Sequence, residues 1–102
     1  MEAVLAELKQ IEGIALASDV GEALEAAGTL DADTLCAVAT VSAKQLRNLG
    51  ELLSAGNLER WYVVTEQHTY YVSERPGGRL VAIGEPVKAP EGTSKALHKA
   101  VR

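Results

Sequence analysis

The 102-residue sequence has no phenylalanine, one tryptophan, three tyrosines and a single cysteine. Because Cys36 has no partner in the chain, an internal disulfide is excluded, and so is a zinc site built from several cysteines. No apolar run approaches the roughly 20 residues that a membrane-spanning helix needs. The first four residues show no basic leader followed by a long apolar stretch, so no signal peptide is expected. We therefore expect a cytoplasmic protein with no membrane insertion.

Charge of either sign is also modest. The 10 Lys and Arg residues against 14 Asp and Glu residues give a formal net charge of −4, with no broad basic field for a nucleic-acid backbone. A hydrophobic content of 47% with 24% charged residues is typical of a globular chain, and residues 1–102 are expected to form one domain. Alanine, leucine and valine replace large aromatic side chains in the expected core. We therefore expect self-association to add buried surface to this small domain.

The first part of the chain is predicted to be a helix followed by a hairpin. Residues 2–12 are expected to be helical and to end at Gly13, because apolar side chains recur there at helical spacing. Ile14 and Leu16 alternate with alanines, which favours a strand, and residues 19–21 (Asp-Val-Gly) favour a turn. Residues 22–27 consist of good helix formers, but they are too few for a helix that is stable without packing. We interpret them as the second strand.

Residues 31–54 carry the clearest pattern, that of a long helix with Asp31 at its N-cap and Asp33 in its first turn. Two adjacent stripes run along it. The first contains larger residues: Leu35, Val38, Ser42, Leu46, Leu49 and Leu53. The second contains small residues: Cys36, Ala39, Ala43 and Gly50. Together they are wider than the stripe that one sheet covers, so we expect a second packing partner, whose backbone approaches the small residues.

Three extended segments follow, at residues 58–65, 70–72 and 80–84, separated by a polar turn and by the turn sequence at residues 75–78 (Arg-Pro-Gly-Gly). Pro86 and Pro90 precede a short final helix over residues 93–101. The order is helix, two strands, long helix, three strands, helix. The predicted fold class is α+β, with a five-stranded antiparallel sheet and helices on both faces, as in a profilin-like sandwich.

This order, the segment from Leu30 through Arg60, and the extended runs at residues 61–64, 70–72 and 80–83 resemble the Roadblock/dynein light chain family over nearly the whole chain. The resemblance is a pattern of spacing and hydrophobicity. Family members usually have an Asp-Gly hairpin where this chain has residues 19–21, and a second strand more β-branched than residues 22–27. The short end after Pro90 lacks the extensions that some bacterial members carry.

The resemblance implies a non-catalytic protein that forms a dimer with itself or with a paralogue. In the family, the long helix packs beside its partner's copy and the third strand pairs edge to edge. The implied interface consists of Cys36, Ala39, Ala43 and Gly50 on the helix and Leu58, Arg60, Trp61, Tyr62, Val63 and Val64 on the strand. The family's dimers act as platforms for small Ras-like GTPases or as adaptors. The implied partner surface here is the polar helix face of Lys44, Arg47, Asn48 and Glu51, although such a face is usually only solvated.

No candidate catalytic, cofactor or metal site emerges from the residues. Cys36 is interpreted as an ordinary buried thiol. His68 and His98 are thirty residues apart, and both are expected to be exposed rather than to bind a metal. The chain has no phosphate-binding glycine motif and no Gly-x-Ser-x-Gly sequence, so any GTP belongs to a partner.

Three functional hypotheses remain. The first is a cytoplasmic dimeric regulator or scaffold for a small GTPase or signalling complex. The second is a ligand-sensing module of profilin-like or PAS-like outline, with a pocket lined by Tyr70 and Tyr71, or an adaptor subunit of a heterodimer. An enzyme is the third and least supported, because the residues show no convergent acid, base and nucleophile.

Overall fold

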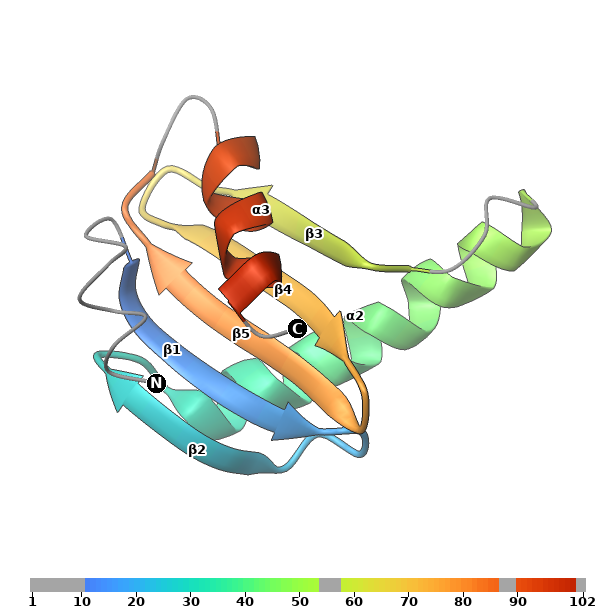
Figure 1. The fold of residues 1–102 in the computed structure, drawn as a ribbon, viewed down its shortest axis with the longest axis horizontal. Helices are drawn as coiled ribbons and strands as arrows, with labels where there is room; N and C mark the ends of the chain where they lie inside the picture. The colour runs from blue at the N-terminus through green and yellow to red at the C-terminus, as the bar shows by residue number, and fades with distance from the viewer. Residues whose placement is uncertain (1–10, 54–57, 87–89, 101–102) are drawn as a thin grey trace.

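The computed structural model describes residues 11–53, 58–86 and 90–100. Within these residues, five strands form one sheet (Figure 1). They are β1 (Ile11–Ser18), β2 (Ala23–Gly28), β3 (Arg60–Val64), β4 (Thr69–Arg75) and β5 (Gly78–Gly84). The described helices are α2 (Ala32–Leu52) and α3 (Glu91–Ala100). The strand order is β2-β1-β5-β4-β3, and every neighbouring pair is antiparallel.

The two described helices pack on opposite faces of this sheet (Figure 1). Successive strand residues point to alternate faces, so Ala15 and Val81 lie under α2, while Ile14 and Leu80 lie on the face that α3 covers with Leu97. The predicted α+β fold, with its five-stranded antiparallel sheet and helices on both faces, is confirmed. The strand interpretation of residues 22–27 is confirmed as β2.

The predicted end of the first helix is wrong. Residues 1–10 lie outside the described residues, but Ile11 and Glu12 already belong to β1, and Gly13 is inside that strand. Ile11 packs in the core beside α3. At Gly13, a Cβ atom would lie 2.5 Å from the carbonyl oxygen of Thr29, so this glycine permits close chain packing and does not terminate a helix.

The long helix begins as predicted. The Asp31 side chain accepts a hydrogen bond from the Thr34 N–H at 3.3 Å, and Asp33 lies in the first turn. The helix ends at Leu52, and the predicted end at residue 54 lies outside the described residues. The final helix begins two residues earlier than predicted, at Glu91, where the Pro90 carbonyl accepts from the Ser94 N–H.

Candidate interaction surfaces on α2 and β3

The small-residue stripe of α2 faces the chain's own sheet. Cys36, Ala39 and Ala43 are all buried, and the first two pack with Ala15 and Val81. The expectation that these three residues approach a partner helix is therefore corrected: the alanines of β1 let α2 lie close to its own sheet, and small residues on the helix meet small residues beneath it. Gly50 is not buried; it lies in the C-terminal half of α2 and lines a groove beside β3.

The stripe of larger residues lies on the flank of α2 that points along the sheet toward β3. Val38 and Leu53 are exposed, and Leu49 is 51% exposed. The helix α2 lies mainly over β1, β2 and β5, so it covers the outer strands β3 and β4 only in part on this face (Figure 1). A cavity of about 270 Å³ lies between this flank and those strands, lined by Leu35, Val38, Ala39, Ser42, Trp61, Val63, Thr65, Tyr70, Val72 and Val81. An exposed apolar surface is thus present on α2, but it is formed by the stripe of larger residues, while the stripe of small residues faces the chain's own sheet.

The edge of the sheet beside this cavity is also open. β3 pairs only with β4 among the described strands, and its Tyr62, Val63 and Val64 side chains are exposed. An unpaired strand of this composition favours association with another strand. Trp61 is partly buried against the α2 face, so it contributes to the core of its own chain as well as to the cavity wall.

A second groove, of about 410 Å³, lies at the same edge and brings several predicted interface residues together. It is lined by Leu46, Arg47, Gly50, Leu58, Glu59, Arg60, Trp61, Tyr62, Glu91 and Ser94. Arg60 donates to the Glu91 carboxylate at 2.8 Å and thereby ties β3 to α3. This contact, with help from Lys95 and the Tyr62 hydroxyl, holds the pKa of the Glu91 carboxyl below its usual value.

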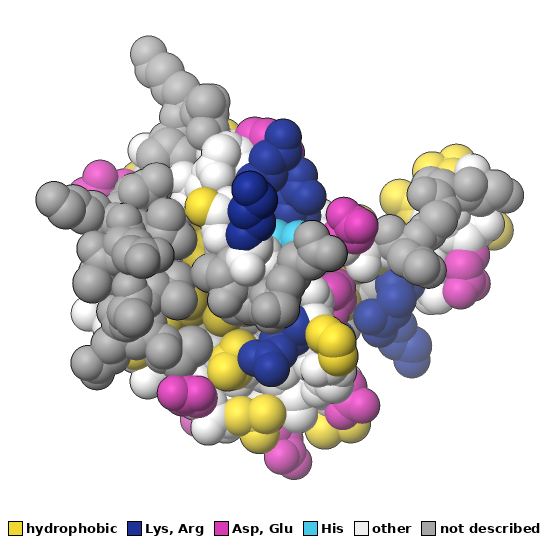
Figure 2. Space-filling model, viewed as in Figure 1, with side chains coloured by type: hydrophobic (Ala, Val, Ile, Leu, Met, Phe, Trp, Pro, Cys, Tyr) yellow, Lys and Arg dark blue, Asp and Glu magenta, His cyan; other side chains and the backbone are white. Residues whose placement is uncertain are grey.

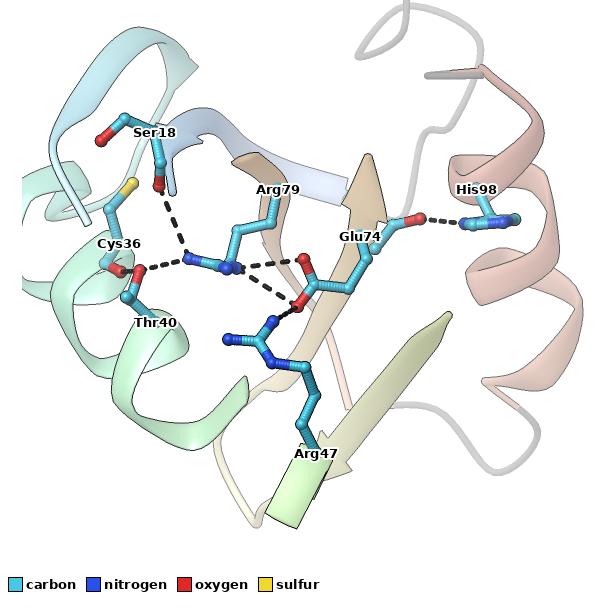
Figure 3. A network of polar contacts seen from close by, with 8 residues as sticks. Ser18, Cys36, Thr40, Arg47, Glu74, Arg79 and His98 are labelled. Carbon is cyan, nitrogen blue, oxygen red and sulfur yellow. Dashed lines mark hydrogen bonds and ion pairs between the residues drawn. The ribbon is translucent and has the colours of Figure 1, made fainter. Parts of the chain in front are cut away.

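A buried arginine that the sequence analysis missed connects α2 to the sheet (Figure 3). Arg79 of β5 is 2% exposed and donates to both oxygens of the Glu74 carboxylate, at 3.4 and 3.3 Å. Its guanidinium also donates to the hydroxyl of Thr40 on α2 and to the Ser18 carbonyl. Glu74 in turn accepts from Arg47 at 3.5 Å. This arrangement satisfies a buried charge and holds α2 and the β1–β2 turn in place.

The four predicted partner-binding residues are not equally available to contact a partner. Lys44, Asn48 and Glu51 are exposed on α2. Arg47 is half-exposed and is engaged by Glu74 (Figure 3). The structure therefore gives Arg47 a contact within its own chain, which the sequence did not reveal.

Cys36, His68 and His98 are each buried or partly buried in their own chain. Burial raises the pKa of the Cys36 thiol and the Asp33 carboxylate raises it further, while Arg79 lowers it, so Cys36 is the buried free thiol that was predicted. The two histidines are partly buried instead of exposed. His98 shares a hydrogen bond with the Ser73 hydroxyl, which anchors α3, and His68 Nδ1 lies 3.6 Å from a Glu12 oxygen.

Within the described residues, no group of three or more histidine, cysteine or carboxylate side chains is placed to hold a metal ion. Nor does the described part of the chain include a helix both long and apolar enough to cross a membrane. Tyr70 lines the 270 Å³ cavity, but Tyr71 is buried on the opposite face, so the expected Tyr70/Tyr71 pair does not share a pocket.

No protein-family model matches the chain, and no curated protein matches it in sequence. Solved structures do. The Roadblock/LC7 domain from Streptomyces avermitilis superposes with a TM-score of 0.82 and 21% identity, covering all of this chain and 91% of that one. This chain has the Roadblock/LC7 fold. An MglB structure with a tetrameric arrangement gives a TM-score of 0.77 at 24% identity, covering 97% of this chain and 76% of that one.

The gliding protein MglB from Thermus thermophilus gives a TM-score of 0.75 at 22% identity, over 98% of this chain and 84% of that chain. The Roadblock/LC7 fold confirms the resemblance inferred from the segment between Leu30 and Arg60.

Proposed function

We propose that this chain is a non-catalytic, cytoplasmic regulator or scaffold that dimerises through α2 and β3 and binds or modulates a small Ras-like GTPase. The observation that carries the proposal is the open apolar flank of α2 beside an unpaired edge strand. Both features leave apolar surface exposed in the isolated chain, and one partner would cover both. The proposed dimer needs no bound cofactor.

A second copy satisfies this geometry. If β3 pairs antiparallel with β3 of a two-fold-related copy, the two sheets become continuous and a second α2 lies over the exposed part of β3 and β4. Its large side chains, among them Leu46 and Leu49, would then enter the 270 Å³ cavity. The proposed interface keeps Gly50, Leu58, Arg60, Trp61, Tyr62, Val63 and Val64. It replaces the buried Cys36, Ala39 and Ala43 with Leu35, Val38, Leu46, Leu49 and Leu53.

The solution mass, measured by sedimentation across concentrations, tests the dimer. Ala43 is buried in its own chain, so substituting it would damage the fold. Leu49→Lys is a sharper test because Leu49 is exposed in the monomer, and we expect it to weaken the dimer at least about 100-fold, since two-fold symmetry counts the loss twice. The matched control is Leu24→Lys on β2, which is also exposed. A monomeric wild-type chain, or equal effects of the two variants, would contradict this interface.

The GTPase partnership is supported by the Roadblock/LC7 fold, shared with MglB, and by the family resemblance of the sequence. In the proposed dimer, Lys44, Asn48 and Glu51 of both copies would be exposed on the α2 side. The test uses a small Ras-like GTPase from the same organism, loaded with GDP or with a non-hydrolysable GTP analogue. We expect binding to depend on the nucleotide and to weaken in the Lys44→Ala/Asn48→Ala variant, whereas Lys95→Ala on α3 should not change it.

The ligand-sensing alternative rests on the cavity itself, whose walls are largely apolar and include Trp61 and Tyr70. A metabolite that fills it would raise the melting temperature in proportion to the logarithm of its concentration. If the chain is a dimer, the partner helix occupies this space, and the same metabolite would instead favour the monomer. Sedimentation in the presence of the metabolite separates the two functions, and a mass of one copy plus a paralogue would indicate a heterodimer.

A further inference from the structure

We propose that the outer edge of β2, together with the β1–β2 turn, binds an extended basic segment of another protein, which adds to the sheet as a sixth strand. This site is at the opposite edge of the sheet from β3 and does not depend on the proposed dimer. β2 is the last strand in the sheet order, and among the described residues no strand pairs with its outer side. With respect to the described part of the chain, its outward main-chain donors and acceptors are open to an incoming strand.

The side chains of this edge suit close approach of a second backbone. Ala23, Ala26 and Ala27 are small on both faces of β2. Leu24, at an irregularity in the β1–β2 register, is 65% exposed, and Val20 at the tip of the turn is 74% exposed. Small residues provide no deep groove for a helix, whereas the free backbone and the two exposed apolar side chains match an extended segment.

The turn that presents Val20 is rigidly held. The N–H of Gly21 donates to the Ser18 carbonyl at 3.1 Å, and the N–H of Glu22 donates to the Ser18 hydroxyl at 3.1 Å. Arg79 also donates to the Ser18 carbonyl (Figure 3). Gly21 has a φ of +93° and lies so close to α2 that a Cβ atom would be 3.1 Å from the Thr40 hydroxyl. The turn thus loses little conformational freedom on binding, which favours affinity.

The negative charge of this part of the chain favours a basic binding partner. Residues 11–43 contain no lysine or arginine but six carboxylates, so this part of the chain has a formal charge of −6 and the rest has +2. All six are exposed: Glu12, Asp19, Glu22, Glu25, Asp31 and Asp33. Figure 2 shows acidic side chains beside hydrophobic ones over β2 and the β1–β2 turn. Arg79 is buried, and Arg75, at the end of β4, is exposed and pairs with Gly78, which in turn pairs with Ser18 beside the turn.

This charge also disfavours a second copy as the occupant. Pairing β2 with β2 of another chain would bring Glu22 and Glu25 of both copies together, and like charges across strands are destabilising. A segment that alternates lysine or arginine with apolar residues would instead meet carboxylates along the edge, while its main chain pairs with β2. The structure thus favours a basic extended peptide from a different protein.

The test uses the full chain and a fluorescently labelled peptide of about eight alternating lysines and valines, a length that spans β2. Binding is followed by anisotropy at low salt, and amide exchange locates it. We expect slower exchange of the β2 amides in the complex. We also expect binding to weaken at least about tenfold in the Glu22→Lys/Glu25→Lys variant. A peptide with the same sequence, N-methylated at alternate residues, should fail to bind because it lacks strand-forming donors.

The matched control is Glu66→Lys/Glu85→Lys, which makes the same change in net charge at exposed positions in the β3–β4 turn and after β5. The proposal is overturned if both double variants lose affinity equally, because binding would then follow total charge. It is also overturned if the wild type does not bind, if the N-methylated peptide binds as well, or if a lysine-rich helical peptide binds without protecting β2. Sedimentation of the Glu22→Lys/Glu25→Lys variant should match wild type, which keeps this result separate from the β3 interface.

Discussion

At the residue scale, the most consequential side chain is Arg79, a cation buried between α2 and the sheet. Its contacts to Glu74, Thr40 and the Ser18 carbonyl join β4, α2 and the β1–β2 turn. A buried charge is destabilising without a partner, so the network makes the packing of α2 conditional on Glu74. The same carboxylate binds Arg47, which limits the freedom of that side chain to act on a partner.

Glu74→Ala should therefore destabilise the fold strongly. It leaves Arg79 buried without its anionic partner, and we expect the free energy of unfolding to fall by about 3 kcal/mol. Chemical denaturation measures the loss. The double variant Glu74→Ala/Arg79→Met should recover part of it, since no uncompensated charge remains. Glu66→Ala, an exposed carboxylate in the β3–β4 turn, serves as the control and should change stability little.

Cys36 should be unreactive in the folded protein. Its thiol is buried and its pKa is raised, so at any pH the thiolate fraction is lower than that of a free cysteine. We expect no alkylation by iodoacetamide at neutral pH and complete alkylation in denaturant, as measured by mass spectrometry. Rapid modification of the native protein would show that α2 leaves the sheet readily.

At the scale of the elements, α3 is attached to the sheet by one large apolar side chain and by polar contacts. Leu97 is its one large, fully buried apolar side chain among the described positions, beside the Ser73–His98 hydrogen bond and the Arg60–Glu91 ion pair. Burial raises the pKa of Tyr71 beneath it, and the Thr93 and Thr69 hydroxyls partly offset this rise. We therefore expect α3 to open at lower free energy than the strands.

The attachment of α3 should weaken in acid. The pKa of Glu91 is lower in the folded state than in the unfolded state, so its contribution is complete above the unfolded pKa and is lost as the pH falls through the folded pKa. Amide exchange of α3, corrected for the intrinsic pH dependence of exchange, should show less protection below that pH. In Glu91→Gln, the protection of α3 should already be reduced at neutral pH and should not fall further in acid. Glu85→Gln should show the same loss of protection in acid as the wild type. An identical pH profile in wild type and Glu91→Gln would contradict this role.

Most elements could be predicted from the sequence because their patterns are local. β-branched and aromatic runs gave β3, and turn residues delimited the β1–β2 hairpin. The end of the first helix was wrong because Ile11 fits a helical stripe as well as a strand, and only the close contact of Gly13 with Thr29 distinguishes them. The orientation of α2 could not be decided, since small residues suit either a close helix or a close sheet.

One feature of the sequence could have indicated the contact between Arg79 and Glu74. Glu74 and Arg79 flank the turn at residues 75–78, and a hairpin with that turn places them opposite each other, as the register confirms. Cross-strand pairs of opposite charge are common, so the pair alone does not indicate burial. The burial of Arg79 depends on α2, which is distant in sequence and whose Thr40 hydroxyl accepts from the guanidinium only once the helix has packed on the sheet.

At the scale of the whole molecule, the core has few aromatic residues and α2 has an exposed apolar flank, so we expect association to contribute to stability. If the folded dimer is the stable form, unfolding releases two chains, and the melting temperature rises with protein concentration. For a dimer of this size, a tenfold increase in concentration should raise it by about 3 °C. Leu49→Lys should lower the melting temperature and abolish its dependence on concentration, whereas Leu24→Lys should retain that dependence. A melting temperature that is independent of concentration in the wild type would indicate that the isolated chain is the stable unit, and the flank of α2 would then have to be covered by a different protein.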